Sequence, residues 1–336
     1  MAKKRIVVVC PGRGSYTRET SGYLKQFGDS AKPHISWMDN QRKTNGLLAL
    51  SELDNAPFKS KIHMAGENAS PLIYACSLSD FFSIDQNLYD IVAITGNSMG
   101  WYIALVLGGA LKIKDGYNLI QEMGAMMKNG IIGGQLIYPF VDENWKFDME
   151  RKTMIYSQIK ETGSFVSIEL GGYIVIGGDQ KSIDLLLKKL PTIKQYPFQI
   201  PLHAAFHTPL LTSVSEKAFQ QFNLSLFKKP TIPLIDGRGK VWSPYSSDPK
   251  ELMDYTLGEQ VTNTFNFNHS ITVAIKEYSP DKIFLLGPGN SLGGAVGQIL
   301  VDNYWLGINS KKDFINRQNN DPYILSMGIP EQRINI

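Results

Sequence analysis

The chain has 336 residues, of which 43% are hydrophobic and 19% are charged, so it can bury a large core and is not of a disordered type. Its formal net charge of +3, without a run of Lys or Arg, argues against nucleic acid or an anionic membrane as a partner. It has two cysteines, Cys10 and Cys76, and its N-terminal apolar run is too short for a signal peptide or a membrane span. We therefore expect a reduced, cytoplasmic protein.

The first third of the chain predicts strands that alternate with helices. Short β-branched runs at residues 6–10 and 90–95 predict two buried strands, and a glycine turn follows each. Residues 70–82, 100–111 and 115–127 carry apolar side chains at helical spacing. This order of strand, turn and helix favours an α/β fold with a mainly parallel sheet.

The middle of the chain changes character and indicates an inserted subdomain. The expected elements are strand 135–140, helix 144–162, strands 164–169 and 173–176, helix 180–190 and strand 194–200. This pattern is typical of a small ferredoxin-like α+β unit. We therefore predict a larger hydrolase-like α/β domain of residues 1–130 and 202–336, with the small subdomain of residues 131–201 inserted in it.

The remaining chain is expected to resume the larger domain. A helix is predicted at residues 208–223, and strands are predicted at residues 231–236 and 282–286. The residues after Asn303 are polar, and we expect them to be irregular and to wrap the surface.

A G-x-S-x-G motif (GNSMG, residues 96–100) lies directly after the second predicted strand and directly before a helix. The chemistry requires a tight turn of this kind, because it projects the serine hydroxyl into a pocket and the glycines permit a close backbone approach. The N-terminus of the helix offers free N–H groups to an oxyanion. Ser98 is therefore the candidate nucleophile, and the alternative is a serine that merely caps the helix.

A nucleophilic serine needs a general base, and the chain offers five histidines. Three lie in polar or irregular surroundings and are expected at the surface: His34, His63 and His269. The other two, His203 and His207, share the segment PLHAAFHTPLL. His207 lies at a turn before the next predicted helix, and this position favours it over His203 as the general base only slightly.

Three segments together resemble the malonyl-CoA:acyl-carrier-protein transacylase family, which includes the acyltransferase domains of fatty-acid and polyketide synthases. With the family's pattern in parentheses, they are CPGRGS at 10–15 (F-P-G-Q-G-S), GNSMGWYIAL at 96–105 (G-H-S-x-G-E-Y-x-A-L) and AFHTPL at 205–210 (A-F-H-S-P-L). Weaker matches lie at 70–76, 260–263 and 286–289. All of them follow the family's order, so the resemblance extends over most of the chain.

The resemblance implies an acyltransferase of the ACP S-malonyltransferase type with a Ser98–His207 dyad. It implies that the backbone carbonyl of Gln260 orients the histidine and that the backbone N–H groups of Arg13 and Met99 form an oxyanion hole. Acyl-CoA would give the acyl group to Ser98, and the phosphopantetheine thiol of an acyl carrier protein would receive it. The resemblance implies no metal and no tightly bound cofactor, and it is compatible with a monomer.

The residues expected to contact the substrate are Arg13, Met123, Phe206 and Asn263. Met123 stands where malonyl-specific members of the family have an arginine that pairs with the malonyl carboxylate, and methionine cannot form this pair. We therefore favour an uncharged acyl group over malonyl. Arg13 replaces the family's glutamine, and it either binds an anionic group of the substrate or forms a structural salt bridge.

Three alternatives remain at this point. Asn97 and Trp101 replace the family's histidine and glutamate beside the nucleophile, which permits an acyl hydrolase of the same fold that clears stalled acyl groups. An α/β-hydrolase esterase would use Asp179 as its acid, although Asp179 is better interpreted as a helix N-cap. A non-catalytic protein that binds acyl-CoA or a carrier protein is the third. No cluster of His, Cys or carboxylates has metal-ligand spacing in the sequence.

Overall fold

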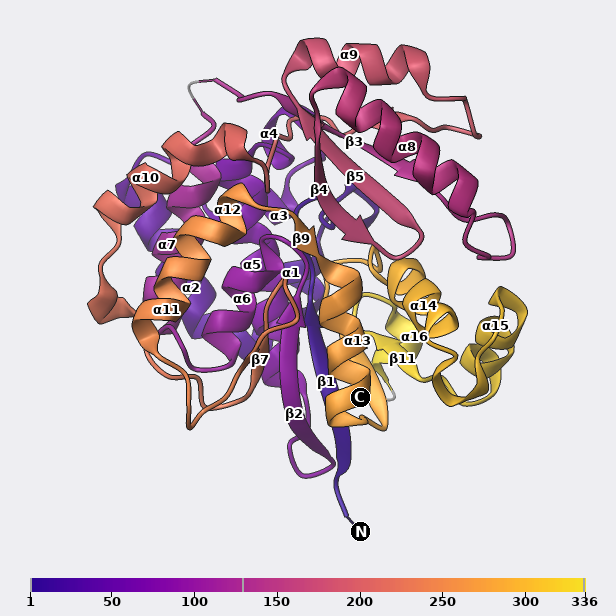
Figure 1. Cartoon of the computed structure of the whole chain (residues 1–336). Helices are drawn as coiled ribbons and strands as arrows, with labels where there is room; N and C mark the ends of the chain where they lie inside the picture. Colours follow the sequence, from indigo (N-terminus) through magenta and orange to yellow (C-terminus); the bar gives the residue numbers. More distant parts are fainter. Residues whose placement is uncertain (1, 129, 335) are drawn as a thin grey trace.

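The computed structural model describes residues 2–128, 130–334 and 336. It contains a six-stranded sheet and a five-stranded sheet, and helices pack against each of them (Figure 1). The larger sheet lies in the lower part of Figure 1, and the smaller sheet lies above the carboxyl ends of its central strands. Ligands of open α/β sheets bind at this end of the strands.

The large sheet has the strand order β11-β10-β1-β2-β7-β8, in which β8 runs antiparallel to β7 and the other neighbours are parallel. Its strands are β1 (Lys4–Cys10), β2 (Tyr89–Gly96), β7 (Leu234–Ile235), β8 (Val241–Trp242), β10 (Lys282–Leu285) and β11 (Ile324–Ser326). Val7, Val8 and Val9 of β1 are fully buried, as expected for a central strand covered on both faces. The predicted fold class is confirmed.

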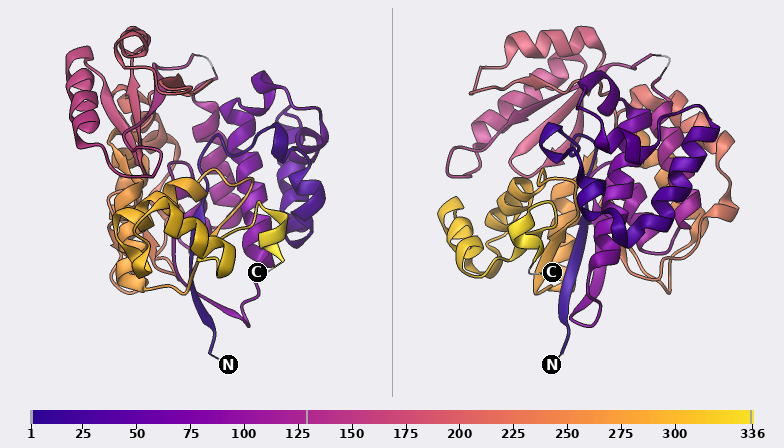
Figure 2. Two further views of the ribbon diagram at one scale, coloured as in Figure 1. Left: turned by 90° about the vertical axis from the view of Figure 1, so that its right-hand side faces the viewer. Right: turned by 180° about the vertical axis from the view of Figure 1, so that it is seen from behind.

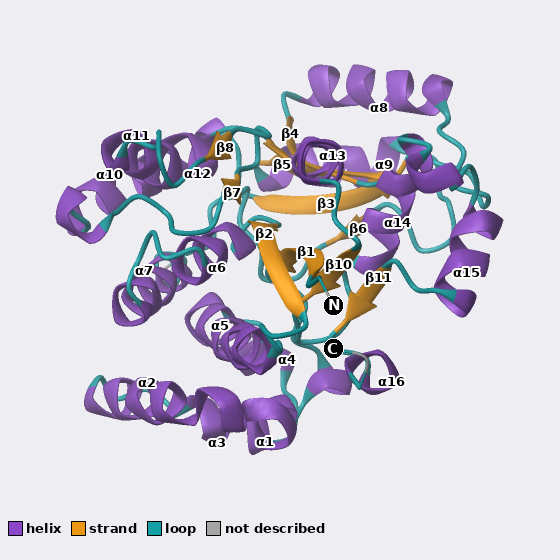
Figure 3. Ribbon diagram, turned by 90° about the horizontal axis from the view of Figure 1, so that it is seen from below, coloured by secondary structure: helices purple, strands orange, loops and turns teal. Residues whose placement is uncertain are grey.

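Helices cover both faces of the large sheet, which Figure 3 shows from below. Helix α6 packs on β1 and β2 from one side, and α13 packs on β2 and β7 from the other. The helices around this sheet are α1 (Tyr23–Phe27), α2 (Lys32–Thr44), α3 (Leu50–Asn55), α4 (Ser60–His63), α5 (Gly66–Ser83), α6 (Gly100–Leu107), α7 (Ile113–Ala125), α10 (Thr212–Gln221), α11 (Pro249–Asp254), α12 (Gln260–Thr262), α13 (Phe267–Tyr278), α14 (Gly293–Asp302), α15 (Lys311–Asn320) and α16 (Pro330–Arg333). Within the described residues, none of the helices combines the length and the apolar character that a membrane crossing requires.

The small sheet has the order β6-β3-β5-β4-β9 and carries two helices, α8 (Met149–Thr162) and α9 (Gln180–Lys189). Its strands are β3 (Gly134–Pro139), β4 (Phe165–Leu170), β5 (Tyr173–Gly178), β6 (Phe198–Gln199) and β9 (Phe265–Asn266). The sheet and its helices enclose a core of their own and stand at one end of the molecule in both views of Figure 2. Because β9 comes from a distant segment and pairs with β4, it ties this unit to the large one.

The chain after Asn303 is not irregular, so this expectation was wrong. It forms α15 and then β11, which pairs in parallel with β10 and extends the large sheet. The residues Tyr323, Ile324 and Leu325 are buried. Burial of this short apolar run stabilises the edge of the sheet, although the surrounding tail is polar.

Several predicted elements are shorter than expected: the helix at 100–111 ends at Leu107, and the strand at 231–236 is reduced to β7. The helix predicted at 144–162 begins at Met149, because the Asp148 carboxylate accepts a hydrogen bond from the N–H of Arg151 and caps it there. The strand predicted at 194–200 is reduced to β6, because Ile193 and Tyr196 pair within a tight turn. The helix predicted at 208–223 is divided into a 3₁₀ turn and α10.

Candidate active site

Ser98 lies on the turn between β2 and α6, at the carboxyl end of the central strands. A Cβ atom on Gly96 would lie 2.4 Å from the carbonyl oxygen of Gly100, and a Cβ on Gly100 would lie 2.4 Å from the carbonyl oxygen of Cys10. Ser98 has a φ of 55°, in the left-handed region that is unfavourable for residues other than glycine. The turn therefore needs both glycines and holds the serine in a strained, fixed conformation.

His207 precedes the short 3₁₀ turn Pro209–Leu211 and contacts the serine directly. Ser98 Oγ and His207 Nε2 are 2.7 Å apart, and His207 Nδ1 is 2.5 Å from the carbonyl oxygen of Gln260. A carbonyl only accepts, so the proton of the neutral ring lies on Nδ1 and Nε2 accepts from the serine hydroxyl. The backbone N–H of His207 also donates to the carbonyl of Val261. These contacts fix both the orientation and the tautomer of the imidazole.

Gln260 contacts both Ser98 and His207: its main-chain carbonyl accepts from His207, and its side chain reaches Ser98. The hydroxyl of Tyr102 donates to Gln260 Oε1 at 3.0 Å, and Gln260 Nε2 donates to the carbonyl oxygen of Ser98 at 3.1 Å. The resemblance assigns Gln260 a main-chain role only, so sequence reasoning misses this contact. The available signal is Tyr102, which belongs to the segment that matches the family's G-x-S-x-G pattern.

The N–H groups predicted to form an oxyanion hole belong to residues that line the cavity beside Ser98, namely Arg13 and Met99. Met99 is the N-cap of α6, where N–H groups lack intrahelical acceptors. Among the hydrogen bonds of the described residues, neither N–H is taken up by an acceptor. Both are available to a negatively charged oxygen, and their role in catalysis stays a prediction.

The Arg13 side chain does not form the structural salt bridge that the sequence left open, because no carboxylate within the described part of the chain pairs with it. Its Nη2 donates to the carbonyl oxygens of Met64 and Leu202, at 3.3 and 3.0 Å. The guanidinium lies over the ring of Phe206, and its buried Nε has no hydrogen-bond partner. Burial lowers the pKa of Arg13 to about 10, so the group remains a cation at neutral pH.

A cavity of about 460 Å³, including its open mouth, lies beside the serine. It is lined by Arg13, Ser70, Ser98, Met99, Tyr102, Ile120, Met123, Gly124, Phe206, His207, Gln260 and Val261. The structure thus places Met123 and Phe206 in the same wall as the candidate dyad. Asn263 is exposed and is not among the lining residues, so its contact with substrate remains a prediction.

The pKa of His207 predicts an unusual pH dependence. Burial lowers this pKa from 6.5 to about 4, and the hydrogen bond to the Gln260 carbonyl opposes the shift only in part. The imidazole therefore remains an unprotonated base as the pH falls, until the pH reaches the lowered pKa. We expect kcat/KM for acyl-CoA to be constant between about pH 8 and about pH 5 and to fall only near pH 4. A steady-state pH profile tests this, and an acid limb at 6.5 would contradict it.

Two other candidates for catalytic groups have partners elsewhere. His203 Nδ1 lies 3.0 Å from Gln135 Oε1, and burial lowers the pKa of this histidine well below its usual value. Asp179 accepts a hydrogen bond from the N–H of Ser182 and caps α9, which confirms its interpretation as an N-cap. The ring nitrogen that a triad acid would contact is bonded to a carbonyl instead.

His63 is buried, so its expected place at the surface was wrong. The N–H of Lys59 donates to Nδ1, Nε2–H donates to the carbonyl of Leu53, and the ring packs on Phe58. These contacts give the imidazole a structural role between α3 and α4. Within the described residues, no group of three or more His, Cys, Asp or Glu side chains is placed to hold a metal ion.

Comparisons with known proteins support the resemblance seen in the sequence. No protein-family model matches the chain. The malonyl CoA-acyl carrier protein transacylase of Bacillus subtilis (strain 168) is 25% identical over 238 residues, which make up 69% of this chain and 72% of that protein.

Solved structures agree with this match. The acyl-carrier-protein S-malonyltransferase from Burkholderia pseudomallei 1710b has a TM-score of 0.76 at 18% identity and covers 98% of both chains. A chain from the complex of a type II polyketide synthase acyl carrier protein with its malonyl-transacylase has a TM-score of 0.71 at 17% identity, covering 88% of this chain and 93% of that chain. The resemblance to malonyl-CoA:acyl-carrier-protein transacylases is therefore confirmed, and the fold extends over nearly the whole chain.

Proposed function

We propose that this chain is an acyltransferase that moves an acyl group from acyl-CoA to the phosphopantetheine thiol of an acyl carrier protein, through an ester on Ser98. The observation that carries the proposal is the 2.7 Å contact between Ser98 Oγ and His207 Nε2, with Nδ1 of the same ring held by a carbonyl. Similarity to transacylases supports the reaction class, and a related malonyl-transacylase solved with its carrier protein supports the acceptor.

In the first half-reaction, His207 takes the proton of Ser98 as the serine oxygen attacks the thioester carbonyl. The N–H groups of Arg13 and Met99 stabilise the oxyanion, and CoA leaves as a thiol that takes the proton from His207. In the second, the carrier thiol gives its proton to His207 and attacks the ester, and Ser98 recovers that proton. The Gln260 carbonyl holds the ring in the required tautomer throughout.

Water competes with the carrier thiol for the acyl ester, so the cavity must exclude it for transfer to succeed. The apolar part of the wall, with Ile120, Met123 and Val261, supports transfer because it offers few polar partners to water. The hydrolase alternative has less support, because the relatives compared above are transacylases. The default pathway under this proposal is fatty-acid synthesis, and polyketide synthesis fits the same chemistry.

The acyl group under this proposal is uncharged, such as acetyl or butyryl. Met123 lines the cavity with a thioether, which binds apolar groups and forms no charge-assisted bond to a carboxylate. Loss of one charged, bidentate contact costs about 2–4 kcal/mol. The chain is therefore expected to disfavour malonyl by roughly thirtyfold to several hundredfold relative to an enzyme with arginine at this position.

The prediction is that acetyl-CoA and butyryl-CoA acylate Ser98 faster than malonyl-CoA does. Intact-protein mass spectrometry after incubation with each acyl-CoA gives the mass of the adduct and its rate of formation. Met123→Arg should raise the rate with malonyl-CoA, and Met123→Leu, which adds no charge, should not.

A clear preference of the wild-type protein for malonyl-CoA would contradict this proposal and would direct attention to the unpaired guanidinium of Arg13. The lifetime of the adduct decides between transfer and hydrolysis. An acyl-enzyme that persists until carrier protein is added supports transfer, whereas rapid release of free acid without a carrier supports the hydrolase.

A further inference from the structure

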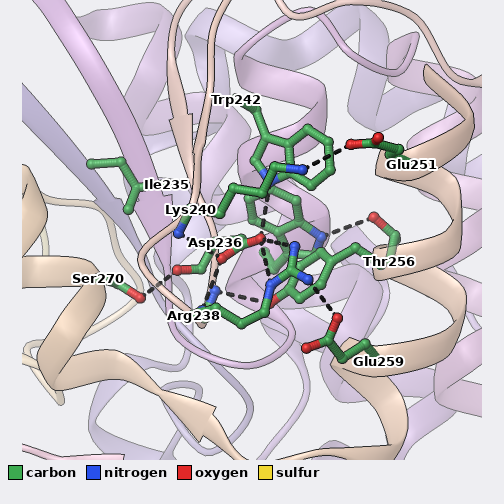
Figure 4. A network of polar contacts seen from close by, with 12 residues as sticks. Ile235, Asp236, Arg238, Lys240, Trp242, Glu251, Thr256, Glu259 and Ser270 are labelled. Carbon is green, nitrogen blue, oxygen red and sulfur yellow. Dashed lines mark hydrogen bonds and ion pairs between the residues drawn. The ribbon is translucent and has the colours of Figure 1, made fainter. Parts of the chain in front are cut away.

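Figure 4 shows a network of charged and aromatic side chains around Asp236 and Arg238. Its centre is Asp236, a fully buried carboxylate directly after β7. Asp236 Oδ2 accepts hydrogen bonds from Arg238 Nη2 at 2.6 Å, from Arg238 Nε at 3.1 Å and from Trp242 Nε1 at 3.0 Å. Its Oδ1 accepts from the N–H groups of Arg238 and Lys240. The buried charge is therefore fully paired within the hairpin of β7 and β8, whose connecting residues 236–240 are called the Asp236 loop below.

The remaining terminal nitrogen of the Arg238 guanidinium, Nη1, makes a contact outside this loop. Its Nη1 donates to Glu259 Oε2 at 2.5 Å. The side chains of Arg238 and Glu259 are about one third exposed. Arg238 already neutralises the buried Asp236, and Glu259, itself a carboxylate, plays no part in that neutralisation. This ion pair joins the Asp236 loop to Glu259, which directly precedes Gln260 in the chain.

Glu259 ends a π-helical turn, Tyr255–Glu259, which leads into Gln260 without a break. π-Helical turns are rare in proteins, and those that occur often lie at functional sites. Other contacts hold the turn from two sides: Trp101 Nε1 donates to Thr256 Oγ1 at 3.0 Å, and the guanidinium of Arg238 lies 4.1 Å from the centre of the Tyr255 ring. Trp101 belongs to α6, the helix that begins beside Ser98.

The turn therefore connects the helix of the nucleophile, the Asp236 loop and the carbonyl that holds His207. A change in the turn moves the Gln260 carbonyl, because the two are consecutive in the chain. The 2.5 Å contact of that carbonyl with Nδ1 and the 2.7 Å contact of Nε2 with the serine lie on opposite sides of one rigid ring. A shift of the carbonyl is thus passed on to the contact with the serine.

We infer that Arg238 and Glu259 are positioning residues, whose ion pair fixes the π-helical turn that presents the Gln260 carbonyl to His207. The inference rests on the proposed Ser98–His207 dyad. Neither residue lines the cavity beside Ser98, so we expect both to act on the rate of serine attack and not on ligand binding. A displacement of about 1 Å at such a site lowers a rate by up to about 10²-fold, and loss of one of several braces is expected to cost about tenfold.

The test is the reaction of Ser98 with a fluorophosphonate probe, in which the serine oxygen bonds to phosphorus, fluoride leaves and His207 takes the proton. We expect Glu259→Ala to lower kinact about tenfold while KI stays within about twofold. Arg238→Lys keeps a cation for Asp236 but lacks the fork that reaches Glu259, so it should give the same loss. Glu259→Gln keeps an oxygen that accepts from Nη1 and should retain most of kinact.

The matched control is Glu251→Ala. Glu251 accepts a hydrogen bond from Lys240 of the same loop at 2.8 Å, but it lies on α11, outside the π-helical turn. This variant should keep wild-type kinact. The inference is overturned if Glu259→Ala and Arg238→Lys react within twofold of wild type, if the change appears in KI alone, or if Glu251→Ala loses as much. A wild-type protein that the probe does not label at Ser98 would contradict the proposed function itself.

Discussion

Ser98→Ala is expected to abolish the acyl-enzyme and to lower acyl transfer by at least about 10⁴-fold. In the proposed mechanism the reaction passes through an ester on this oxygen, and the cavity beside it offers no second hydroxyl in contact with His207 among the described residues. Mass spectrometry of the variant with acetyl-CoA should show no adduct. Carrier acylation should fall to the level that binding and the oxyanion N–H groups alone provide.

Ser79→Ala is the control for the loss of a buried serine hydroxyl. Ser79 lies in α5, and its hydroxyl donates to the carbonyl of Ala75 in the same helix, so its removal leaves the site intact. We expect wild-type adduct formation from this variant. An adduct of full mass on Ser98→Ala would show that another residue carries the acyl group.

His207→Ala is expected to lower the rate of Ser98 acylation by about 10³-fold, within the range that a positioned general base contributes. The serine then has to lose its proton to water, and no charged or polar group among the described residues replaces Nε2 at the serine oxygen. Since the proposed role of His207 is to take the proton of Ser98 during attack and not to bind CoA, KM should change much less than kcat. Single-turnover measurements over a range of acyl-CoA concentrations separate the two.

His203→Ala is the matched control, because this histidine belongs to the same segment and is half-buried. Its Nδ1 contacts Gln135 and not the serine, so the variant should keep its acylation rate within about fivefold of wild type. If the two variants lose activity equally, His207 has no special role, and the assignment of the base fails.

The elements around the nucleophile follow from local pattern. The β-branched run of β1 and the apolar residues of α5 form the expected strand and helix, and both are buried almost continuously, as expected for central elements that are covered on all sides. The glycines around Ser98 are explained by the close backbone approaches at that turn. Local pattern fails where a short apolar run lies in a polar surrounding, as at Ile324, or where a carboxylate such as Asp148 sets the start of a helix.

In the candidate site, too, some residues can be predicted from local pattern and others cannot. Ser98 stands out in the sequence because strand, turn and helix are adjacent in the chain, whereas the preference for His207 over His203 depends on the resemblance. The distance between Ser98 Oγ and His207 Nε2 settles which of the two rings contacts the serine, across a separation of 109 residues. The side-chain bridge of Gln260 has only Tyr102 as a signal in the sequence, and the pairing of Arg238 with Glu259 has none.

Three features of this protein follow from residues that are close together in the chain: the alternation of strand and helix, the tight turn at Ser98 and the thioether in place of a guanidinium at Met123. These follow from periodicity, steric limits and side-chain chemistry, which act over a few residues. Three other features are visible only in the folded chain: which imidazole contacts the serine, that Arg13 has no carboxylate partner among the described residues, and how a π-helical turn meets the Asp236 loop. These depend on the packing of segments far apart in the chain, where a displacement of an ångström makes or removes a hydrogen bond.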